Sequence, residues 1–271
     1  MTHTIAVVGC GTMGQAIVSG LLAGGVANGR LQASVRREER RGELESALGI
    51  RISLDNAAVA RAADIVILAV KPQGVAELFS DGVLREVLRG KLLVSICAGV
   101  RLEQLSGWLP DTALIRAMPN TPCLIREGMT VLSPGPNCTA RHLEWATQIF
   151  ASVGRCRTLD EKHLDAVTAL SGSGPAFAYV MLEALADGGV MMGLPRAAAF
   201  ELAAQTMQGA ARMVLETGGH PAALRDQVTT PAGCTIAGLL MMEDGRIRST
   251  LARSIQEATR VAAGLGRPQD K

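Results

Sequence analysis

A threonine-rich segment near the C-terminus combines residue types that bind small anions. Residues 228–238 read Val-Thr-Thr-Pro-Ala-Gly-Cys-Thr-Ile-Ala-Gly and lead directly into a helical pattern. The N-terminus of a helix presents unpaired backbone N–H groups and the positive end of the helix dipole. Threonine hydroxyls beside that end would add further donors. The segment therefore predicts a site for a small carboxylate, the alternative being a threonine-rich helix cap.

A glycine-rich motif lies at the opposite end of the chain. An apolar strand pattern is followed by Gly9, Gly11 and Gly14 in the spacing Gly-x-Gly-x-x-Gly, with Thr12 and Met13 before the last glycine. Between a first strand and a helix, this motif binds the pyrophosphate of a dinucleotide. The first glycine permits a tight turn, the second admits the pyrophosphate, and the third lets the helix pack on the strand. The alternative is a glycine turn without a ligand.

The residues that end the second strand pattern indicate which dinucleotide is bound. A chain that binds NAD usually carries Asp or Glu there for the ribose hydroxyls. This chain carries Ser34, Val35, Arg36 and Arg37 instead. A hydroxyl and two guanidinium groups suit a 2′-phosphate, which arginine binds in a bidentate manner. The sequence therefore predicts NADP, with NADPH preferred and NADH possible; alternatively, both arginines only begin a solvated helix.

Loops at the carboxyl ends of the next strands are expected to line the same cofactor crevice. They comprise Val70, Lys71 and Pro72 after the third strand pattern, and Cys97, Ala98 and Gly99 after the fourth. Lys71 is equally well explained as a surface lysine.

Composition and charge exclude several function classes. The 271 residues carry a net charge of +2 without an uninterrupted basic block, so nucleic-acid binding is not expected. The six cysteines are scattered without a Cys-x-x-Cys pair, which argues against a zinc site and a disulfide framework. No apolar stretch is long enough to span a membrane, and a strand pattern starts too early for a signal peptide. We therefore expect a cytoplasmic protein that binds neither nucleic acid, membrane nor metal.

The first 160 residues alternate short apolar runs with amphipathic segments. Strand patterns occupy residues 4–8, 31–35, 64–70, 92–97, 113–118 and 129–132. Helical patterns occupy residues 13–23, 38–48, 74–88, 101–109 and 140–152. Strands that alternate with helices form parallel sheets covered on both faces. The sequence thus predicts an α/β Rossmann-type domain over residues 1–160.

Residues 161–271 carry helical patterns without a convincing strand. These patterns cover residues 163–170, 176–192, 196–216, 231–242 and 247–263. Residues 177–186 are apolar on almost every side, as in a helix that is buried all round. A small helical domain offers little cover for such a helix on its own. We therefore predict an all-α domain that forms the core of an obligate oligomer, unless the first domain covers this helix.

The chain lacks the catalytic groups of several oxidoreductase classes. Tyr179 is the sole tyrosine and Glu183 follows it by four positions, so a Tyr-x-x-x-Lys dyad is absent. No lysine lies between Lys162 and Lys271, which argues against 3-hydroxyacid dehydrogenases. The four histidines lie outside any motif and are expected at the surface or at helix caps. A site without a strong acid or base suits an imine, which accepts a hydride once protonated and mainly needs positioning.

The threonine-rich segment and its surroundings resemble the signature of the pyrroline-5-carboxylate reductase family. The resemblance extends over the whole chain in order and spacing, through residues 69–73, 117–122, 170–176, 188–196 and 224–238. The chain departs from the family at Ala232, where glycine is usual, and at Cys234, where threonine or alanine is frequent. Both positions act mainly through their backbone, so the activity is expected to be retained.

The resemblance implies reduction of 1-pyrroline-5-carboxylate to L-proline by NADPH or NADH, the last step of proline synthesis. It implies that Thr230, Gly233, Cys234 and Thr235 bind the substrate. The Thr230 hydroxyl and the backbone N–H groups of Cys234 and Thr235 would hold the carboxylate. The Thr235 hydroxyl would bond the ring nitrogen and relay its proton, which makes Thr235 the catalytic residue.

The resemblance implies further contacts with the cofactor. Asn56 matches a position on the adenosine side, and Met118, Pro119 and Asn120 would border the nicotinamide. Residues 171–175 resemble the hinge of the helical domain.

Finally, the resemblance implies interlocked homodimers, often assembled into a decamer, in which the substrate loop of one subunit meets the cofactor domain of its partner. Two other functions remain open. One is a reductase of another cyclic imine, such as a six-membered ring, and the other is an NADP-binding sensor without activity. The sequence does not decide the ratio of NADPH to NADH use, dimer against decamer, or inhibition by proline.

Overall fold

The computed structural model describes residues 3–80 and 82–265. These residues form two compact units, each considered by itself. The first unit comprises the residues up to Ser173 together with those from Glu257 onwards, and the second spans Gly174–Gln256.

The first unit is built on an eight-stranded sheet with the order β3-β2-β1-β4-β5-β6-β7-β8. The strands are β1 (Ile5–Val8), β2 (Leu31–Ser34), β3 (Arg51–Ser53), β4 (Ile65–Leu68), β5 (Leu92–Ser95), β6 (Ala113–Met118), β7 (Gly128–Pro134) and β8 (Gly154–Thr158). Neighbouring strands are parallel except for β6 and β7, which run antiparallel. The Rossmann-type fold predicted from the sequence is therefore confirmed.

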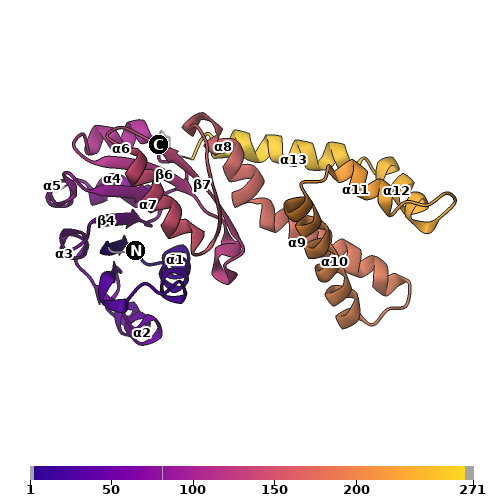
Figure 1. Ribbon diagram of the computed structural model, residues 1–271, viewed down its shortest axis with the longest axis horizontal. Coiled ribbons are helices and arrows are strands. Elements are labelled where there is room, and N and C mark those ends of the chain that lie inside the picture. Colours follow the sequence, from indigo (N-terminus) through magenta and orange to yellow (C-terminus); the bar gives the residue numbers. More distant parts are fainter. Residues whose placement is uncertain (1–2, 81, 266–271) are drawn as a thin grey trace. The chain divides into compact units, whose positions relative to one another are not determined.

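Helices cover both faces of this sheet, which forms the indigo-to-magenta part of Figure 1. One face packs against α1 (Thr12–Ala23), α2 (Glu38–Leu48) and α7 (Ala140–Ala151). The other packs against α3 (Asn56–Arg61), α4 (Val75–Leu78), α5 (Val83–Leu88) and α6 (Leu102–Trp108). In β1, Ile5 and Val7 join the first apolar cluster, while Ala6 and Val8 join the second. Burial on both faces explains why this strand is apolar at every position.

Several short elements differ from the sequence pattern. The helix expected over residues 74–88 is two helices, α4 and α5, with Gly82 at a φ of +78° directly before α5. The pattern does not predict β3, β8 or α3, which have three to six residues each, too few for a clear period. Shorter helical turns are η1 (Asn28–Arg30), η2 (Pro72–Gly74), η3 (Thr121–Ile125), η4 (Glu161–His163), α8 (Leu164–Val167) and the π-helical η5 (Thr168–Gly172).

The second unit is entirely helical among its described residues, as the sequence predicts. It contains α9 (Gly174–Met191), α10 (Arg196–Thr217), α11 (Pro221–Gln227), α12 (Cys234–Asp244) and most of α13 (Ile247–Ala262). Helices α9 and α10 approach closely at Gly189, where an added Cβ would lie 3.3 Å from the Cβ of Ala199. The short helix α11 has no counterpart in the sequence pattern.

The apolar surface of the second unit is largely uncovered. Among its described residues, Ala186 and Ala199 alone are buried. In the segment expected to be buried on every side, Tyr179 is 63%, Val180 65% and Leu185 54% exposed. The single chain therefore does not provide the burial that its sequence demands.

Candidate active site

The three glycines of the N-terminal motif have different structural roles. Gly9 has a φ of +87°, and an added Cβ would lie 2.6 Å from Cγ1 of Val70. At Gly14 an added Cβ would lie 3.0 Å from Cγ1 of Val7, so this glycine lets α1 pack on β1. Around Gly11 there is no heavy atom within 4 Å of an added Cβ among the described residues. Gly11 thus opens onto space that a ligand can approach.

The N-terminus of α1 is suited to a bound anion. Gly11 occupies the N-cap position without a side-chain hydrogen bond, and the first turn has no acidic residue. Thr12 and Met13 begin the helix. The unpaired N–H groups of this turn and the helix dipole favour a negatively charged group, and the glycine leaves room for it. The residues present therefore fit the pyrophosphate of a dinucleotide.

A buried serine links the glycine turn to two other elements. Ser34 ends β2, and its Oγ accepts a hydrogen bond from the Gly9 N–H at 3.3 Å. The same hydroxyl donates to Oδ1 of Asn56 at 2.6 Å. Asn56 is the first residue of α3, whose N-cap Asp55 accepts from the Ala58 N–H. These contacts bring together Gly9, Ser34 and Asn56, three residues that the sequence assigns separately to the cofactor.

The two arginines after β2 are exposed and available for a ligand. Arg37 is the N-cap residue of α2, and Arg36 precedes it. Glu38, in the first turn of α2, pairs with Arg41. Within the described part of the chain, neither Arg36 nor Arg37 makes an ion pair. Their guanidinium groups are therefore not neutralised by the neighbouring acids.

The loops after β4 and β5 are joined through a cysteine. The thiol of Cys97 donates to the carbonyl oxygen of Val70 with an Sγ–O distance of 3.3 Å. Burial raises the pKa of this thiol to about 11, so it stays protonated and is a structural donor rather than a nucleophile. Lys71 is exposed at the start of the short turn that continues with Pro72, and Gly99, next to Ala98, has a φ of +79°.

The segment after β6 is held by an asparagine. Asn120 accepts a hydrogen bond from the Met129 N–H at 2.8 Å and donates to the carbonyl oxygen of Ser171 at 3.2 Å. Pro119 is buried, and Met118 lies beside Gly172, where an added Cβ would be 2.7 Å from the Met118 methyl group. The amide of Asn120 is thus engaged within the protein, and its bonds hold the backbone of residues 118–120, which the resemblance stated above assigns to the nicotinamide.

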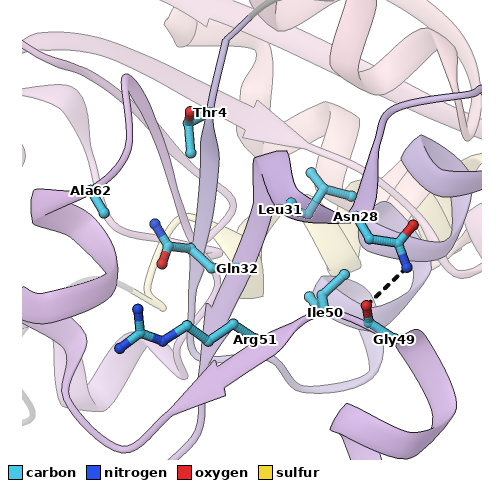
Figure 2. A pocket seen from close by; sticks show the side chains of 9 residues that line it. Thr4, Asn28, Leu31, Gln32, Gly49, Ile50, Arg51 and Ala62 are labelled. Carbon is cyan, nitrogen blue, oxygen red and sulfur yellow. Dashed lines mark hydrogen bonds between the residues drawn. The ribbon is translucent and has the colours of Figure 1, made fainter.

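All these residues lie at or directly after the carboxyl ends of β1 to β6, which the strand register aligns at one edge of the sheet. Cofactors of doubly wound sheets bind at this edge. A hollow of about 490 Å³ lies at the opposite edge, beside Thr4, Asn28, Leu31 and Arg51. Figure 2 shows that the Asn28 side chain points to the carbonyl of Gly49, to which it donates at 2.8 Å. This hollow is therefore separate from the cofactor edge.

The threonine-rich segment of the second unit forms a tight turn before α12. The Gly233 N–H donates to the carbonyl oxygen of Thr230 at 3.1 Å, with Pro231 and Ala232 between them. Ala232 has a φ of +56°, and proline followed by a positive φ is typical of a type II turn. Glycine usually occupies such a position because it lacks a Cβ. The chain therefore keeps this left-handed conformation with an alanine.

The same turn leaves the N-terminus of α12 uncapped. Gly233 is the N-cap residue, without a side-chain hydrogen bond, and the first turn contains no acid. An added Cβ at Gly233 would lie 2.3 Å from Oγ1 of Thr230, so the threonine hydroxyl lies against this helix end. Cys234 and Thr235 are the first two residues of α12. The structure thus gathers Thr230, Gly233, Cys234 and Thr235 around one helix N-terminus.

Two of the four histidines serve as helix caps. His142 and His220 accept hydrogen bonds from backbone N–H groups at the starts of α7 and α11, as the sequence predicts for caps. Residues 3–80 and 82–265 contain no group of His, Cys, Asp or Glu that could hold a metal ion. No helix in these ranges is long and apolar enough to cross a membrane.

Two polar residues have roles that the sequence pattern does not single out. Ser171 accepts from Asn120 through its carbonyl, a contact that spans 51 residues and has no local signal. Arg116 is 4% exposed in the middle of β6, where it is the one charged residue in an apolar strand. A charge within an apolar run is the signal by which Arg116 can be recognised.

We expect contrasting effects of alanine at Gly9 and Gly11. Gly9→Ala forces a Cβ into Val70 at a positive φ, so the variant should lose about 2 kcal/mol or more of unfolding free energy. Gly11→Ala has room for its Cβ and a negative φ of −79°, so its unfolding free energy should stay within about 0.5 kcal/mol of the original. Its methyl group would nevertheless occupy the space of the pyrophosphate and raise the Kd for NADPH about tenfold or more. Denaturant unfolding and fluorescence titration measure both effects. Unchanged NADPH affinity in Gly11→Ala would contradict the assigned pyrophosphate position.

Comparisons with known proteins point to one family. Residues 161–265 match the family model "Pyrroline-5-carboxylate reductase dimerisation", and residues 4–99 match "NADP oxidoreductase coenzyme F420-dependent". A pyrroline-5-carboxylate reductase of Schizosaccharomyces pombe is 44% identical over 96% of this chain and 98% of its own length. One from Methanosarcina acetivorans is 42% identical over 97% of this chain and 98% of its own.

Solved structures of similar proteins have the same fold. A pyrroline-5-carboxylate reductase from Coxiella burnetii has a TM-score of 0.92 at 32% identity, covering 99% of this chain and 100% of its own. A pyrroline carboxylate reductase from Plasmodium falciparum with NADP bound has a TM-score of 0.88 at 28% identity, covering 98% and 99%. Sequence relatives and solved structures agree over nearly the full length of the chain, which therefore belongs to the pyrroline-5-carboxylate reductase family.

Proposed function

We propose that this chain reduces the C=N bond of 1-pyrroline-5-carboxylate to give L-proline, the last step of proline biosynthesis. The uncapped N-terminus of α12 beside the Thr230 hydroxyl carries this proposal, because it offers a small carboxylate several donors at one point. When bound, NADPH supplies the hydride that the imine carbon accepts. The imine nitrogen takes up one proton, relayed from solvent through the Thr235 hydroxyl, and becomes the ring amine.

The substrate contacts follow from this placement. The backbone N–H groups of Cys234 and Thr235 and the hydroxyl of Thr230 hold the carboxylate, and Gly233 keeps the turn close to it. The Thr235 hydroxyl bonds the ring nitrogen and relays its proton, which is the catalytic role. A protonated imine needs no strong general acid, so positioning supplies most of the rate enhancement.

The cofactor binds along the carboxyl edge of the sheet, with NADPH preferred over NADH. Gly9, Gly11, Thr12, Met13 and Gly14 receive the pyrophosphate. Ser34 and Asn56 line the site of the adenosine, and Arg36 binds the 2′-phosphate. The loops after β4, β5 and β6 complete the crevice through Val70, Lys71, Pro72, Cys97, Ala98, Gly99, Met118, Pro119 and Asn120.

The chain acts as a homodimer, either alone or assembled further into a decamer. Support comes from the exposed side chains of Tyr179, Val180 and Leu185, which a water-soluble monomer would not leave uncovered together. We assign dinucleotide binding to residues 1–160, and substrate binding and dimerisation to residues 161–271. We place the protein in the cytoplasm. Sedimentation velocity over a hundredfold range of protein concentration distinguishes monomer, dimer and decamer.

A steady-state assay of NADPH oxidation with 1-pyrroline-5-carboxylate tests the reaction. Turnover with formation of proline supports the proposal, and the ratio of kcat/KM for NADPH to that for NADH gives the cofactor preference. Faster turnover of a six-membered cyclic imine carboxylate would reassign the substrate, although one methylene changes kcat/KM by only about 10- to 200-fold. Tight NADPH binding without turnover of either imine would contradict an enzymatic role.

A further inference from the structure

A buried arginine in β6 has no role in the proposed cofactor or substrate contacts. Arg116 is 4% exposed, and its Nη1 lies 3.0 Å from Oε1 of Glu161. The same carboxylate oxygen accepts a hydrogen bond from the Leu102 N–H at 2.7 Å, at the first residue of α6. Glu161 is therefore paired with a buried cation and a helix N-terminus at once. Asp165 adds a weaker contact, with its Oδ1 4.0 Å from Nη2 of Arg116.

These contacts hold the start of the segment that ends the first unit. Residues 161–173 run through η4, α8 and the π-helical η5 to the boundary with the second unit. Near its other end, the carbonyl of Ser171 accepts from Asn120 and Gly172 lies against the Met118 methyl group. Both ends of the segment are thus attached to β6 or to the residues directly after it.

Only one residue separates Arg116 from Met118 on β6. A shift of the segment at Glu161 would therefore be transmitted to the backbone of residues 118–120, through the contacts of η5. An arginine–carboxylate pair is directional, and a pair with fixed geometry favours one position of the two elements over a sliding apolar contact.

We propose that Arg116 and Glu161 are positioning residues for imine reduction: their ion pair fixes residues 161–173 against the end of β6 and thereby sets residues 118–120. Neither residue is among the proposed substrate or cofactor contacts. The inference rests on the proposed function, because it assigns residues 118–120 to the nicotinamide. It extends the proposed function by two residues, Arg116 and Glu161, that act on the reaction through the backbone of residues 118–120.

The test compares Arg116→Met, Glu161→Gln and the double variant Arg116→Met/Glu161→Gln. Glu161→Gln keeps a neutral acceptor for the Leu102 N–H, so it retains the fold if Arg116→Met does not. Arg89→Met is the matched control, because Arg89 pairs with Asp111 at 3.5 Å in the same unit but its side chain is 62% exposed. For each variant, kcat and the KM for NADPH are measured together with thermal unfolding.

We expect both single variants to lose about tenfold or more in kcat, since a small misplacement of reacting groups has effects of this size. The KM for NADPH should change less than about twofold, because the proposed pyrophosphate and adenosine contacts follow β1 and β2 or lie on α3, away from residues 118–120. The double variant should regain thermal stability, since no unpaired charge remains buried, while its kcat stays low. Recovery of kcat together with stability would reduce the pair to a structural role and overturn the proposal. Arg89→Met should behave as the unchanged protein.

Hydrogen–deuterium exchange provides a readout that does not depend on turnover. In Glu161→Gln, backbone amides of residues 164–173 should exchange faster, whereas those of β1 and β2 should not change. Unchanged exchange in residues 164–173 would overturn the proposal even if kcat falls. If the unchanged protein fails to reduce 1-pyrroline-5-carboxylate, the proposed function fails, and the exchange data still decide whether the ion pair positions this segment.

Discussion

Thr235→Ala should lower kcat/KM for 1-pyrroline-5-carboxylate about tenfold or more while leaving the fold intact. Thr235 is the second residue of α12, beside the uncapped helix end. Loss of its hydroxyl leaves the ring nitrogen without its donor, an effect of about 1–3 kcal/mol. That energy corresponds to about 5- to 150-fold in rate. Alanine is a good helix former, so unfolding free energy should hardly change.

Two further variants test whether loss of the Thr235 hydroxyl causes the fall in kcat/KM. Thr235→Ser keeps the hydroxyl and should retain most of the activity. Thr217→Ala removes a hydroxyl that donates to the Met213 carbonyl at 2.6 Å at the end of α10, and should not affect turnover. Equal loss in Thr235→Ala and Thr235→Ser would point to packing of the methyl group. Full activity of Thr235→Ala would exclude the proposed proton relay, whatever the reaction.

The N-terminal half of the molecule is predictable because its signals are local. Strand and helix periods place the sheet, and Gly9, Gly11 and Gly14 take up positions that follow from the shape of glycine alone. Contacts between segments that are distant in the sequence are harder to predict from it. The hydroxyl of Ser34 meets Asn56 across 22 residues, and Asn120 meets Ser171 across 51. No local period encodes such contacts, so their geometry has to come from the fold.

In the helical unit, the positions of most helices are predictable from the sequence, whereas the cover of their apolar surface is not. Its helices other than α11 follow from the sequence, but its apolar surface is largely uncovered in the single chain. The proposed oligomer would cover residues 177–186, several of whose side chains are largely exposed in the single chain. The left-handed alanine at position 232 is a further case. Proline before it indicates a turn, whereas the positive φ requires the closing hydrogen bond between Gly233 and Thr230.

Arg36→Gln should raise the KM for NADPH about tenfold or more and leave the KM for NADH nearly unchanged. Arg36 follows β2 near the buried Ser34, on the side of the sheet edge assigned to adenosine. A guanidinium group binds a phosphate by charge-assisted hydrogen bonds worth about 1.5–3 kcal/mol, and only NADPH carries the 2′-phosphate. Glutamine keeps hydrogen-bonding capacity but removes the charge. Steady-state kinetics with each cofactor measures the change.

Arg41→Gln is the matched control, because Arg41 is exposed on α2, which begins two residues after Arg36, but already pairs with Glu38. It should leave both KM values within about twofold, since an exposed pair contributes little. Salt gives an independent check: the KM for NADPH should rise with ionic strength in the unchanged protein, and this rise should shrink in Arg36→Gln. If Arg37→Gln rather than Arg36→Gln removes the preference, the phosphate binds one residue further along. If neither variant changes the ratio of NADPH to NADH use, the cofactor preference does not arise at the end of β2. The absence of an Asp or Glu at that position would then not reflect binding of a 2′-phosphate.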